Sequence, residues 1–310
     1  MTEVREGDQE DTDVFETAGD DSAKDVESRW VELPSVNMLS LQGADELLRW
    51  REASVVAIVG ERNGGKTTLV TELYERFLRG PFAGCFYSHS LTIQGFESKT
   101  FQSRADSGAE LPDTGRTSKT DGLKFFHLSV SDESSVRTDL LISERAGETY
   151  RDVRNRPEVA VQIVEVRKAR KVVFILDGER VADPRRRAEA IASVRSLMRI
   201  FVDQNAISTQ SEIQIVTTKW DLLIGDSMAI ARETVSKFEE HSIAIYSDGF
   251  TKVRTFRIAA RDPVGVMEAG FGLEPLLRSW VDPIPQTAFA PPQLPPLTDE
   301  FDRLLLKRAN

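Results

Sequence analysis

The sequence predicts a three-layer α/β domain with a doubly wound, mostly parallel sheet. Two observations carry this prediction. Short apolar runs alternate along the chain with longer segments whose apolar residues recur at helical spacing. One of the runs, Val172–Leu176, is apolar throughout, which is typical of a parallel strand buried on both faces. Strands that alternate with helices in this way favour a sheet covered by helices on both sides.

The composition indicates one large domain with extensions. The chain has 310 residues, of which 40% are hydrophobic, and this is enough for a full core. Residues 1–29 hold eleven acidic and three basic residues, a balance of −8 that leaves −2 of the net charge of −10 to the rest. We expect a disordered acidic tail at 1–29, the folded domain at 30–282, and a proline-rich linker with a terminal amphipathic helix at 283–310.

Charge and cysteine content exclude several classes of protein. A nearly neutral remainder argues against general nucleic-acid binding, and no apolar run is long enough to span a bilayer. The single Cys85 has no disulfide partner, so we expect a cytoplasmic protein with no nucleic-acid or membrane partner and a buried thiol. We expect the short basic runs Arg167–Lys171 and Arg185–Arg187 to be solvated helix faces.

The predicted elements follow in chain order. A helix at 43–50 should lie against the sheet through Leu47, Leu48 and Trp50, and a strand at 54–59 precedes a helix at 68–79. Further elements are a hairpin of residues 123–130 and 138–143, a helix opened by Pro157, a helix begun by Asp183 and Pro184, a strand at 213–217, a helix around 228–241, a strand at 253–258 and a helix at 273–280. The long polar stretch 88–122 is expected to be functional or mobile.

A phosphate-binding loop joins the first of these strands to its helix. Residues 60–67 read Gly-Glu-Arg-Asn-Gly-Gly-Lys-Thr and fit G-x-x-x-x-G-K-[ST]. In this motif backbone N–H groups wrap the phosphates, the lysine reaches the β- and γ-phosphates, and the hydroxyl binds Mg²⁺. We therefore expect Lys66 at the phosphates and Thr67 at the metal. The other nucleotide-binding positions are Gly60, Arg62, Asn63, Gly64, Gly65 and Thr68.

Three further segments follow strand ends, where open α/β sheets bind their ligands. Glu144 can hold Mg²⁺, and the Gly147 N–H can approach a γ-phosphate because no Cβ intervenes. The Asp221 carboxylate can accept two hydrogen bonds from the N1–H and N2–H₂ edge of guanine, while the stem of Lys219 covers the ring. Adenine offers no such pair of donors. A backbone N–H near Ala260 could meet guanine O6.

These motifs resemble the GTPases of the translation-factor-related (TRAFAC) class, whose signatures are the phosphate loop, D-x-x-G and [N/T]-K-x-D. More closely, Ile142–Glu148, Phe174–Glu179 and Thr218–Asp221 look like bacterial double-GTPase domains, predicted members of GTPase-centred conflict systems. The resemblance covers roughly residues 30–282. It implies a P-loop, small-GTPase-like fold that binds GTP or GDP with Mg²⁺, hydrolyses GTP slowly, and acts in bacterial signalling or conflict.

Three residues depart from the pattern of the class. Glu144 stands where the pattern has Asp, a carboxylate one methylene shorter. Thr218 replaces the commoner Asn, so we expect the loss of an amide that braces the base-binding loop to the phosphate loop. Arg62 stands where Ras-like proteins carry glycine. It would crowd an arginine supplied in trans, although its own guanidinium could reach the γ-phosphate.

The resemblance also implies candidates for catalysis. Thr117, with Thr120 as the alternative, is expected to close on Mg²⁺ and the γ-phosphate. The neighbouring Arg116 is either an internal arginine finger or an ordinary solvated arginine. Glu148 occupies the position that orients the attacking water, where a carboxylate would also repel the phosphate, so we expect slow turnover. Residues 88–122 and 145–156 are expected to reorder between nucleotide states.

Two other functions remain open from the sequence. One is an ATP-using P-loop enzyme such as a small-molecule kinase, and the other is a module that binds nucleotide without turnover. A protein partner is also expected, because Phe301 and Leu304 share one face of the terminal helix. His89, His127 and His241 lack the spacing of a metal site, and His127 is expected to be structural.

Overall fold

The computed structural model describes residues 37–100, 122–250, 252–261, 265–268 and 270–282. The predicted acidic tail and terminal helix lie outside them. The strands are β1 (Leu39–Ser40), β2 (Ala53–Val59), β3 (Phe86–His89), β4 (Lys124–Ser131), β5 (Arg137–Glu144), β6 (Lys171–Asp177), β7 (Glu212–Thr218) and β8 (Lys252–Arg257). The α-helices are α1 (Leu41–Trp50), α2 (Lys66–Leu78), α3 (Ile93–Thr100), α4 (Gly147–Asn155), α5 (Val164–Lys168), α6 (Gly178–Ala182), α7 (Arg187–Asp203), α8 (Ala229–Tyr246) and α9 (Leu273–Val281).

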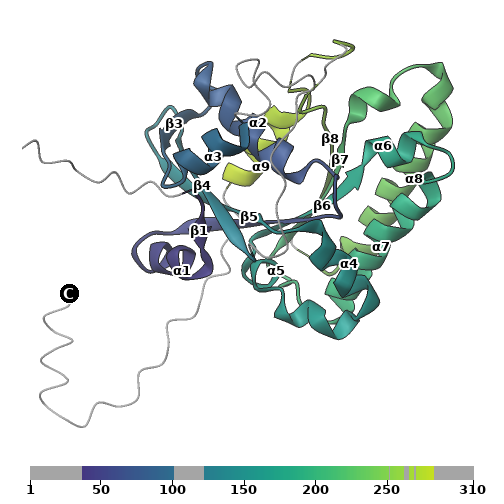
Figure 1. Cartoon of the computed structure of the whole chain (residues 1–310), viewed down its shortest axis with the longest axis horizontal. Coiled ribbons are helices and arrows are strands. Elements are labelled where there is room, and N and C mark those ends of the chain that lie inside the picture. Colours follow the sequence, from purple (N-terminus) through teal and green to yellow (C-terminus); the bar gives the residue numbers. More distant parts are fainter. Residues whose placement is uncertain (1–36, 101–121, 251, 262–264, 269, 283–310) are drawn as a thin grey trace, which may run out of the picture. The chain divides into compact units, whose positions relative to one another are not determined.

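The strands form one mixed sheet. Its order is β1-β4-β5-β2-β6-β7-β8, and β3 pairs with β4 on the same side as β1. Strands β5, β2, β6, β7 and β8 are parallel, while β4 runs antiparallel to β5. The predicted α/β architecture with a mostly parallel sheet is therefore confirmed (Figure 1).

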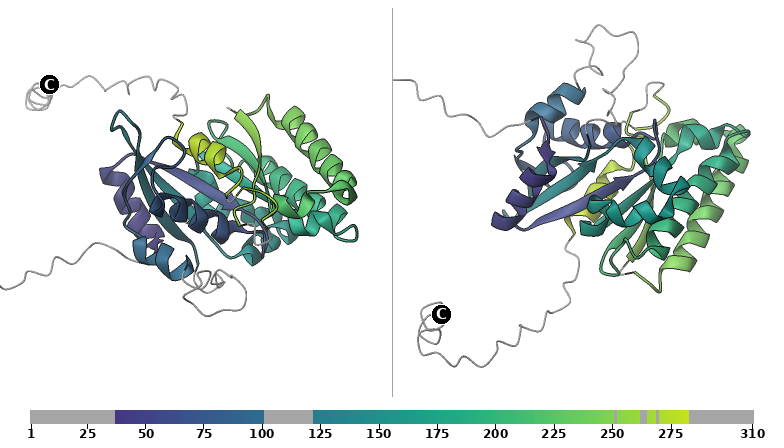
Figure 2. Two further views of the ribbon diagram at one scale, coloured as in Figure 1. Left: turned by 90° about the horizontal axis from the view of Figure 1, so that it is seen from above. Right: turned by 60° about the horizontal axis from the view of Figure 1, so that its bottom comes forward.

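Alternation along the strands buries both faces of the sheet. In β2, Val55 and Ala57 pack into the core formed with α4, α5, α7 and α8, whereas Val56 and Ile58 pack into the core formed with α2, α3 and α9. Figures 1 and 2 show these two groups of helices on opposite faces. Because both faces are covered, only the loops at the ends of the parallel strands are left to build a site.

Local signals located most elements, with two corrections. The hairpin is confirmed, since β4 and β5 pair along their whole length. Pro157 opens a short 3-10 turn (Pro157–Gln162), and α5 follows as a separate helix. Asp183 does not begin the next helix: α7 starts at Arg187. The Asp183 carboxylate instead accepts the Arg185 N–H at 2.9 Å, which stabilises the turn between α6 and α7.

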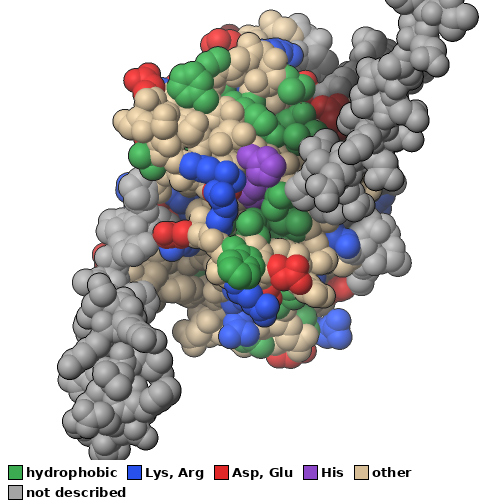
Figure 3. Space-filling model, turned by 90° about the vertical axis from the view of Figure 1, so that its left-hand side faces the viewer, with side chains coloured by type: hydrophobic (Ala, Val, Ile, Leu, Met, Phe, Trp, Pro, Cys, Tyr) green, Lys and Arg blue, Asp and Glu red, His purple; other side chains and the backbone are tan. Residues whose placement is uncertain are grey.

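Two side chains lie where the sequence did not predict them. Trp50, expected to pack on the sheet, is the last residue of α1 and is 87% exposed. Figure 3 shows the side of the molecule with α1, β1 and β3, where hydrophobic side chains lie beside basic ones. Lys171, expected on a solvated helix face, is only 1% exposed. Its Nζ donates to the backbone carbonyls of Ser279 and Asp282 at the end of α9, and burial lowers its pKa to about 8.

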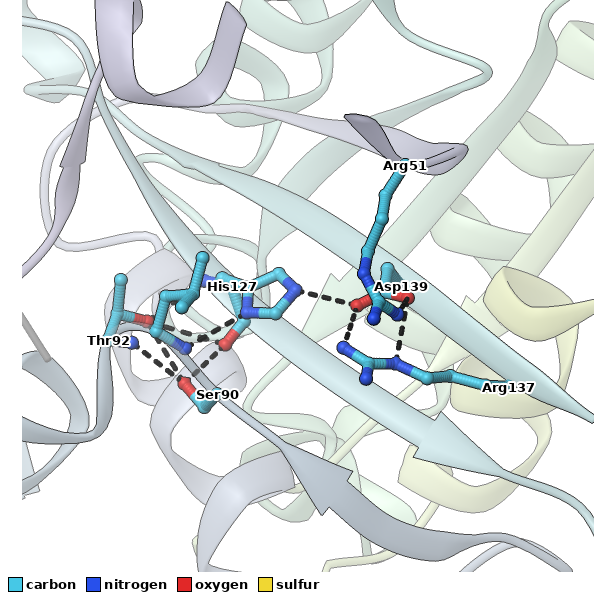
Figure 4. A network of polar contacts seen from close by, with 7 residues as sticks. Arg51, Ser90, Thr92, His127, Arg137 and Asp139 are labelled. Atoms are coloured by element: carbon cyan, nitrogen blue, oxygen red, sulfur yellow. Dashed lines mark hydrogen bonds and ion pairs between the residues drawn. The ribbon is translucent and has the colours of Figure 1, made fainter. Parts of the chain in front are cut away.

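His127 is a structural histidine, as predicted (Figure 4). Its buried ring accepts the Leu91 N–H at Nδ1 (3.0 Å), so Nε2 carries the proton and donates to Asp139 at 2.9 Å. Arg137 binds both oxygens of the same carboxylate. Burial raises the pKa of Asp139, but the hydrogen bonds from His127 and Arg137 bring it well below its usual range. The ring is fully committed to these contacts.

The same histidine closes a gap at the edge of the sheet. On the side of β4 away from β5, β1 pairs as far as Phe125 and β3 pairs from Ser129 onward, so His127 has no partner strand on that side. Its backbone N–H donates to Thr92 Oγ1 (2.9 Å), and its carbonyl accepts from Ser90 Oγ (2.6 Å). Two hydroxyl groups thus stand in for a neighbouring strand.

The described part of the chain holds neither a cluster of metal ligands nor a helix that could cross a membrane. No three His, Cys, Asp or Glu side chains cluster there as metal ligands would. None of the helices in the described part of the chain combines the length and hydrophobicity needed to traverse a bilayer. Cys85 is buried, as expected.

The lowered pKa of Lys171 predicts a pH dependence of stability. Between about pH 8 and pH 10.5 the unfolded chain binds a proton at this lysine that the folded chain has lost. The free energy of unfolding should therefore rise with pH by up to about 1.4 kcal/mol per pH unit, relative to Lys171→Met. Urea unfolding of both proteins from pH 7 to pH 10 measures the difference. A difference that stays constant over this range contradicts the prediction.

Candidate functional site

The loop between β2 and α2 has the backbone that a phosphate-binding loop requires. Asn63 and Gly65 both adopt left-handed conformations, with φ of 62° and 85°. Gly65 precedes α2, which begins at Lys66, so the N–H groups of the first helical turn end the loop. A Cβ at Gly60 would lie 2.8 Å from the Ile175 Cβ of β6. The first glycine is therefore required by close packing on the neighbouring strand.

Lys66 is held inside this loop. Its Nζ donates to the carbonyl oxygens of Gly60 and Glu61, each at 2.9 Å. Burial lowers the pKa of the Lys66 ammonium, while the carboxylates of Glu144 and Glu148 act in the opposite direction. A buried ammonium held by neutral carbonyls is a strong donor for an anion that enters the loop.

Thr67 and Glu144 meet at the start of α2. The Thr67 hydroxyl donates to Glu144 Oε1 at 2.6 Å, which brings the first helical turn to the end of β5. A hydroxyl beside a carboxylate is an oxygen donor set of the kind that Mg²⁺ takes together with nucleotide phosphates. The two residues therefore fit the metal, and the longer side chain of Glu144 reaches Thr67 directly. Thr68 follows in the same turn.

Gly147 begins α4 against the backbone of the phosphate loop. A Cβ at this position would lie 2.3 Å from the Arg62 nitrogen and 2.5 Å from the carbonyl carbon of Glu61. Only glycine allows such an approach. The next residue, Glu148, lies near the Arg62 side chain, with 3.7 Å between Glu148 Oε1 and Arg62 Nε.

Thr218 ties the Lys-x-Asp segment to the phosphate loop, contrary to the sequence-based expectation. Its Oγ1 donates to the Gly64 carbonyl at 2.9 Å. The Nζ of the following Lys219 donates to the Asn63 carbonyl, also at 2.9 Å. A threonine hydroxyl is long enough here because Thr218, at the end of β7, lies within van der Waals reach of Gly65. The Thr218 hydroxyl therefore makes the connection for which an asparagine amide is the commoner group.

Two carboxylates that the sequence left without a role hold Lys219. The Lys219 Nζ lies 2.6 Å from Glu179 and 3.1 Å from Asp177. Burial lowers the pKa of Lys219, but these two carboxylates raise it above its usual range. Between them, Gly178 packs so closely that a Cβ would lie 2.2 Å from the Thr218 carbonyl oxygen. The sequence feature that could have predicted this role is the Asp-Gly-Glu run at the end of the buried strand β6.

The remaining two segments join the same edge of the sheet. Asp221 lies half-buried in the 3-10 turn Trp220–Leu223. The Trp220 N–H donates to the Ile258 carbonyl at 2.9 Å, which ties this turn to the segment that leads from β8 to Ala260.

The segment at Ala260 is also tied to α2. The side chain of the next residue, Arg261, donates to Glu72 of α2 at 2.5 Å. The contacts therefore connect all four predicted motifs through the phosphate loop and its helix.

The partners of Glu61, in the phosphate loop, were not foreseen. Glu61 accepts hydrogen bonds from Arg154 of α4, from Arg180 of α6 (2.7 Å) and from Ser193 of α7 (2.6 Å). Burial raises the pKa of Glu61, but these three donors lower it overall, so the carboxylate stays charged. Its partners lie 93 to 132 residues away in the chain, beyond the reach of local sequence patterns.

The segment 145–156, which is expected to reorder between nucleotide states, is tied to α5, β2 and the phosphate loop in this structure. Arg145 forms two hydrogen bonds to the buried Glu165 of α5. The buried Tyr150 hydroxyl donates to the Ile58 carbonyl of β2 at 3.1 Å. Any rearrangement of this segment must break these contacts as well as the Arg154–Glu61 pair. Thr117, Thr120 and Arg116 lie outside the described residues.

One known protein family matches most of the chain. The model of the family described as Double-GTPase 2 matches residues 54–281. The chain belongs to this family. Membership makes it a GTPase-like nucleotide-binding domain. None of the curated proteins matches the chain.

Three solved structures are similar to this member of the Double-GTPase 2 family, each with a TM-score of 0.37. The mammalian SRP receptor is 15% identical, with 73% of this chain and 98% of the receptor chain covered. Roco2 RocCORdC of Methanosarcina barkeri, bound to GDP, is 13% identical, with 74% and 49% covered. The S. cerevisiae Ski7 GTPase-like domain, bound to GDP and inorganic phosphate, is 12% identical, with 77% and 51% covered. The chain spans about half of the latter two.

The close approach of Gly147 predicts the effect of one methyl group. In Gly147→Ala the added carbon would lie 2.3 Å from the phosphate-loop backbone, so α4 and the loop must move apart. We expect nucleotide affinity to fall at least about tenfold, with a loss of melting temperature. Binding of a fluorescent GTP analogue and thermal unfolding measure both effects. Gly249→Ala is the matched control, because its added carbon has no neighbour closer than 4.0 Å. Equal behaviour of the two variants would contradict the prediction.

Proposed function

We propose that the protein is a guanine-nucleotide-binding switch that binds GTP with Mg²⁺ and hydrolyses it slowly to GDP and phosphate. The observation that carries this proposal is the pair of bonds from Thr218 and Lys219 to carbonyls of the phosphate loop. They place the Lys-x-Asp segment next to the loop that would hold the phosphates. One small molecule with a purine at one end and phosphates at the other would span both.

Guanine is the base that this segment favours. The Asp221 carboxylate can accept two hydrogen bonds from guanine N1–H and N2–H₂, and adenine has no such pair. Asp177 and Glu179 keep Lys219 charged and in place, so that its stem can cover the ring. An ATP-using kinase has no need for these residues.

Mg²⁺ would be held by Thr67 and Glu144, which already meet at 2.6 Å. When bound, the ion would neutralise charge on the β- and γ-phosphates. Lys66 would give up its carbonyl partners for phosphate oxygens, which are stronger acceptors because they are charged. Glu148 could orient the attacking water, but its charge opposes the γ-phosphate, and this supports slow turnover. The setting in bacterial signalling or conflict, and a protein partner, follow from the family resemblance alone.

The guanine assignment is tested by Asp221→Asn. An asparagine amide can donate to the O2 of xanthine but cannot accept both guanine donors. We expect the variant to lose GTP affinity by about a hundredfold and to gain affinity for XTP. Thermal shifts with GTP, GDP, ATP and XTP, all with Mg²⁺, report this, since ligand at 100 times its dissociation constant stabilises by about 2.7 kcal/mol. Asp226→Asn, at an exposed position nearby, is the control. Unchanged base preference in Asp221→Asn would remove the guanine assignment.

Hydrolysis is tested by Lys66→Ala in single-turnover assays with GTP and Mg²⁺. Loss of the buried ammonium should slow phosphate release by at least about a hundredfold, because it removes charge stabilisation at the phosphates. Lys237→Ala removes an exposed lysine of α8 and should have no effect. If the unchanged chain and Lys66→Ala both release phosphate at the background rate, the protein is a binding module without turnover.

A further inference from the structure

Two opposite charges face each other where the phosphate loop meets α4. Arg62 belongs to the loop and Glu148 to the first turn of the helix, and 3.7 Å separates Nε from Oε1. Their side chains are 49% and 38% exposed.

Packing beneath the pair forces the two residues together. Gly147 lies so close to the Arg62 nitrogen that no side chain fits between them. The far end of α4 is held by the Arg154 bond to Glu61, and its middle by the buried Tyr150 hydroxyl. Glu148 therefore cannot move far from the phosphate loop without the loss of buried contacts. The close packing of Gly147 on the phosphate loop therefore keeps Arg62 and Glu148 near each other.

The neighbours of Lys66 indicate what the Arg62–Glu148 pair can do. Glu144 accepts the hydroxyl of Thr67, the residue after Lys66, and Glu148 follows Gly147, which contacts the backbone of the phosphate loop. Both carboxylates therefore lie beside the loop that would bind the phosphates. A γ-phosphate would add negative charge to a place where Glu148 already carries one. Arg62 offsets that repulsion, and its exposed guanidinium can turn from a carboxylate to a phosphate. A diphosphate brings less charge to this end of the loop.

We propose that Arg62 and Glu148 form a charge pair that sets the affinity for the nucleoside triphosphate relative to the diphosphate. When the triphosphate binds, Arg62 passes from Glu148 to the γ-phosphate. When the diphosphate is bound, Arg62 stays with Glu148. The inference rests on the proposed nucleotide-binding function and deepens it, since it names the residues that distinguish the two ligands.

An ordinary surface ion pair leads to a different expectation. Exposed pairs contribute little to stability, and removing either partner has small effects. Such a pair would not change the affinity for GTP and GDP by different factors. The ratio of the two dissociation constants therefore separates the two possibilities.

The experiment measures dissociation constants for GTP and GDP, with Mg²⁺, in the full chain and in three variants. Arg62→Ala leaves Glu148 unopposed and should weaken GTP about tenfold more than GDP. Glu148→Gln frees Arg62 and should shift the ratio toward GTP. The double variant removes both charges and should return the ratio to near its original value. Arg199→Ala removes an exposed arginine of an i,i+4 pair on α7 and should leave the ratio unchanged.

The GDP affinity serves as a check on folding, because a misfolded variant loses both ligands. Arg62→Gln, with a longer side chain than alanine, repeats the test if Arg62→Ala fails to fold. A GTP-to-GDP ratio within twofold of the original in both Arg62 variants overturns the inference. If the unchanged chain binds GTP with the Asp221 dependence described above, that result leaves the proposed function intact. If the unchanged chain binds neither nucleotide, both proposals fail.

Discussion

The hydrogen bond from the Thr218 hydroxyl to the Gly64 carbonyl joins the two halves of the candidate site. Thr218 lies at the end of β7 and Gly64 in the loop after β2, and these strands are separated by β6 in the sheet. Parallel order brings their carboxyl ends to one edge, and the Thr218 bond, with the neighbouring Lys219 bond, fixes the spacing between the two loops. A ligand that spans both halves therefore meets a distance set before it arrives, which lowers the entropy that binding must overcome.

Most of the glutamates at this site lie beside a cationic side chain. Four glutamates, Glu61, Glu144, Glu148 and Glu179, lie in or beside the phosphate loop, where an anionic ligand is proposed to bind. Three of them have cationic partners: Glu61 has Arg154 and Arg180, Glu148 has Arg62, and Glu179 has Lys219. Glu144 instead accepts the Thr67 hydroxyl. The result is a polar rim in which most of these acidic groups face a cation, and α4 belongs to that rim as much as to the segments expected to move.

The sequence predicted what local patterns encode. The strand at 54–59, the phosphate loop and the hairpin of β4 and β5 were all found, because their signals lie within a few neighbouring residues. It missed the partners of Glu61 and the burial of Lys171, since both depend on residues about a hundred positions away. It also misplaced the start of α7, because Asp183 before a proline is a capping signal that a turn can use equally well.

The hydroxyl groups beside His127 affect whether another protein chain can pair with this edge of the sheet. An open strand edge with free N–H and C=O groups is a template on which another chain can build a sheet and begin to aggregate. At the middle of β4 that template is already occupied, because Ser90 and Thr92 hold both backbone groups of His127. Intermolecular strand addition would have to displace these bonds first, so this edge is protected against self-association without a further strand.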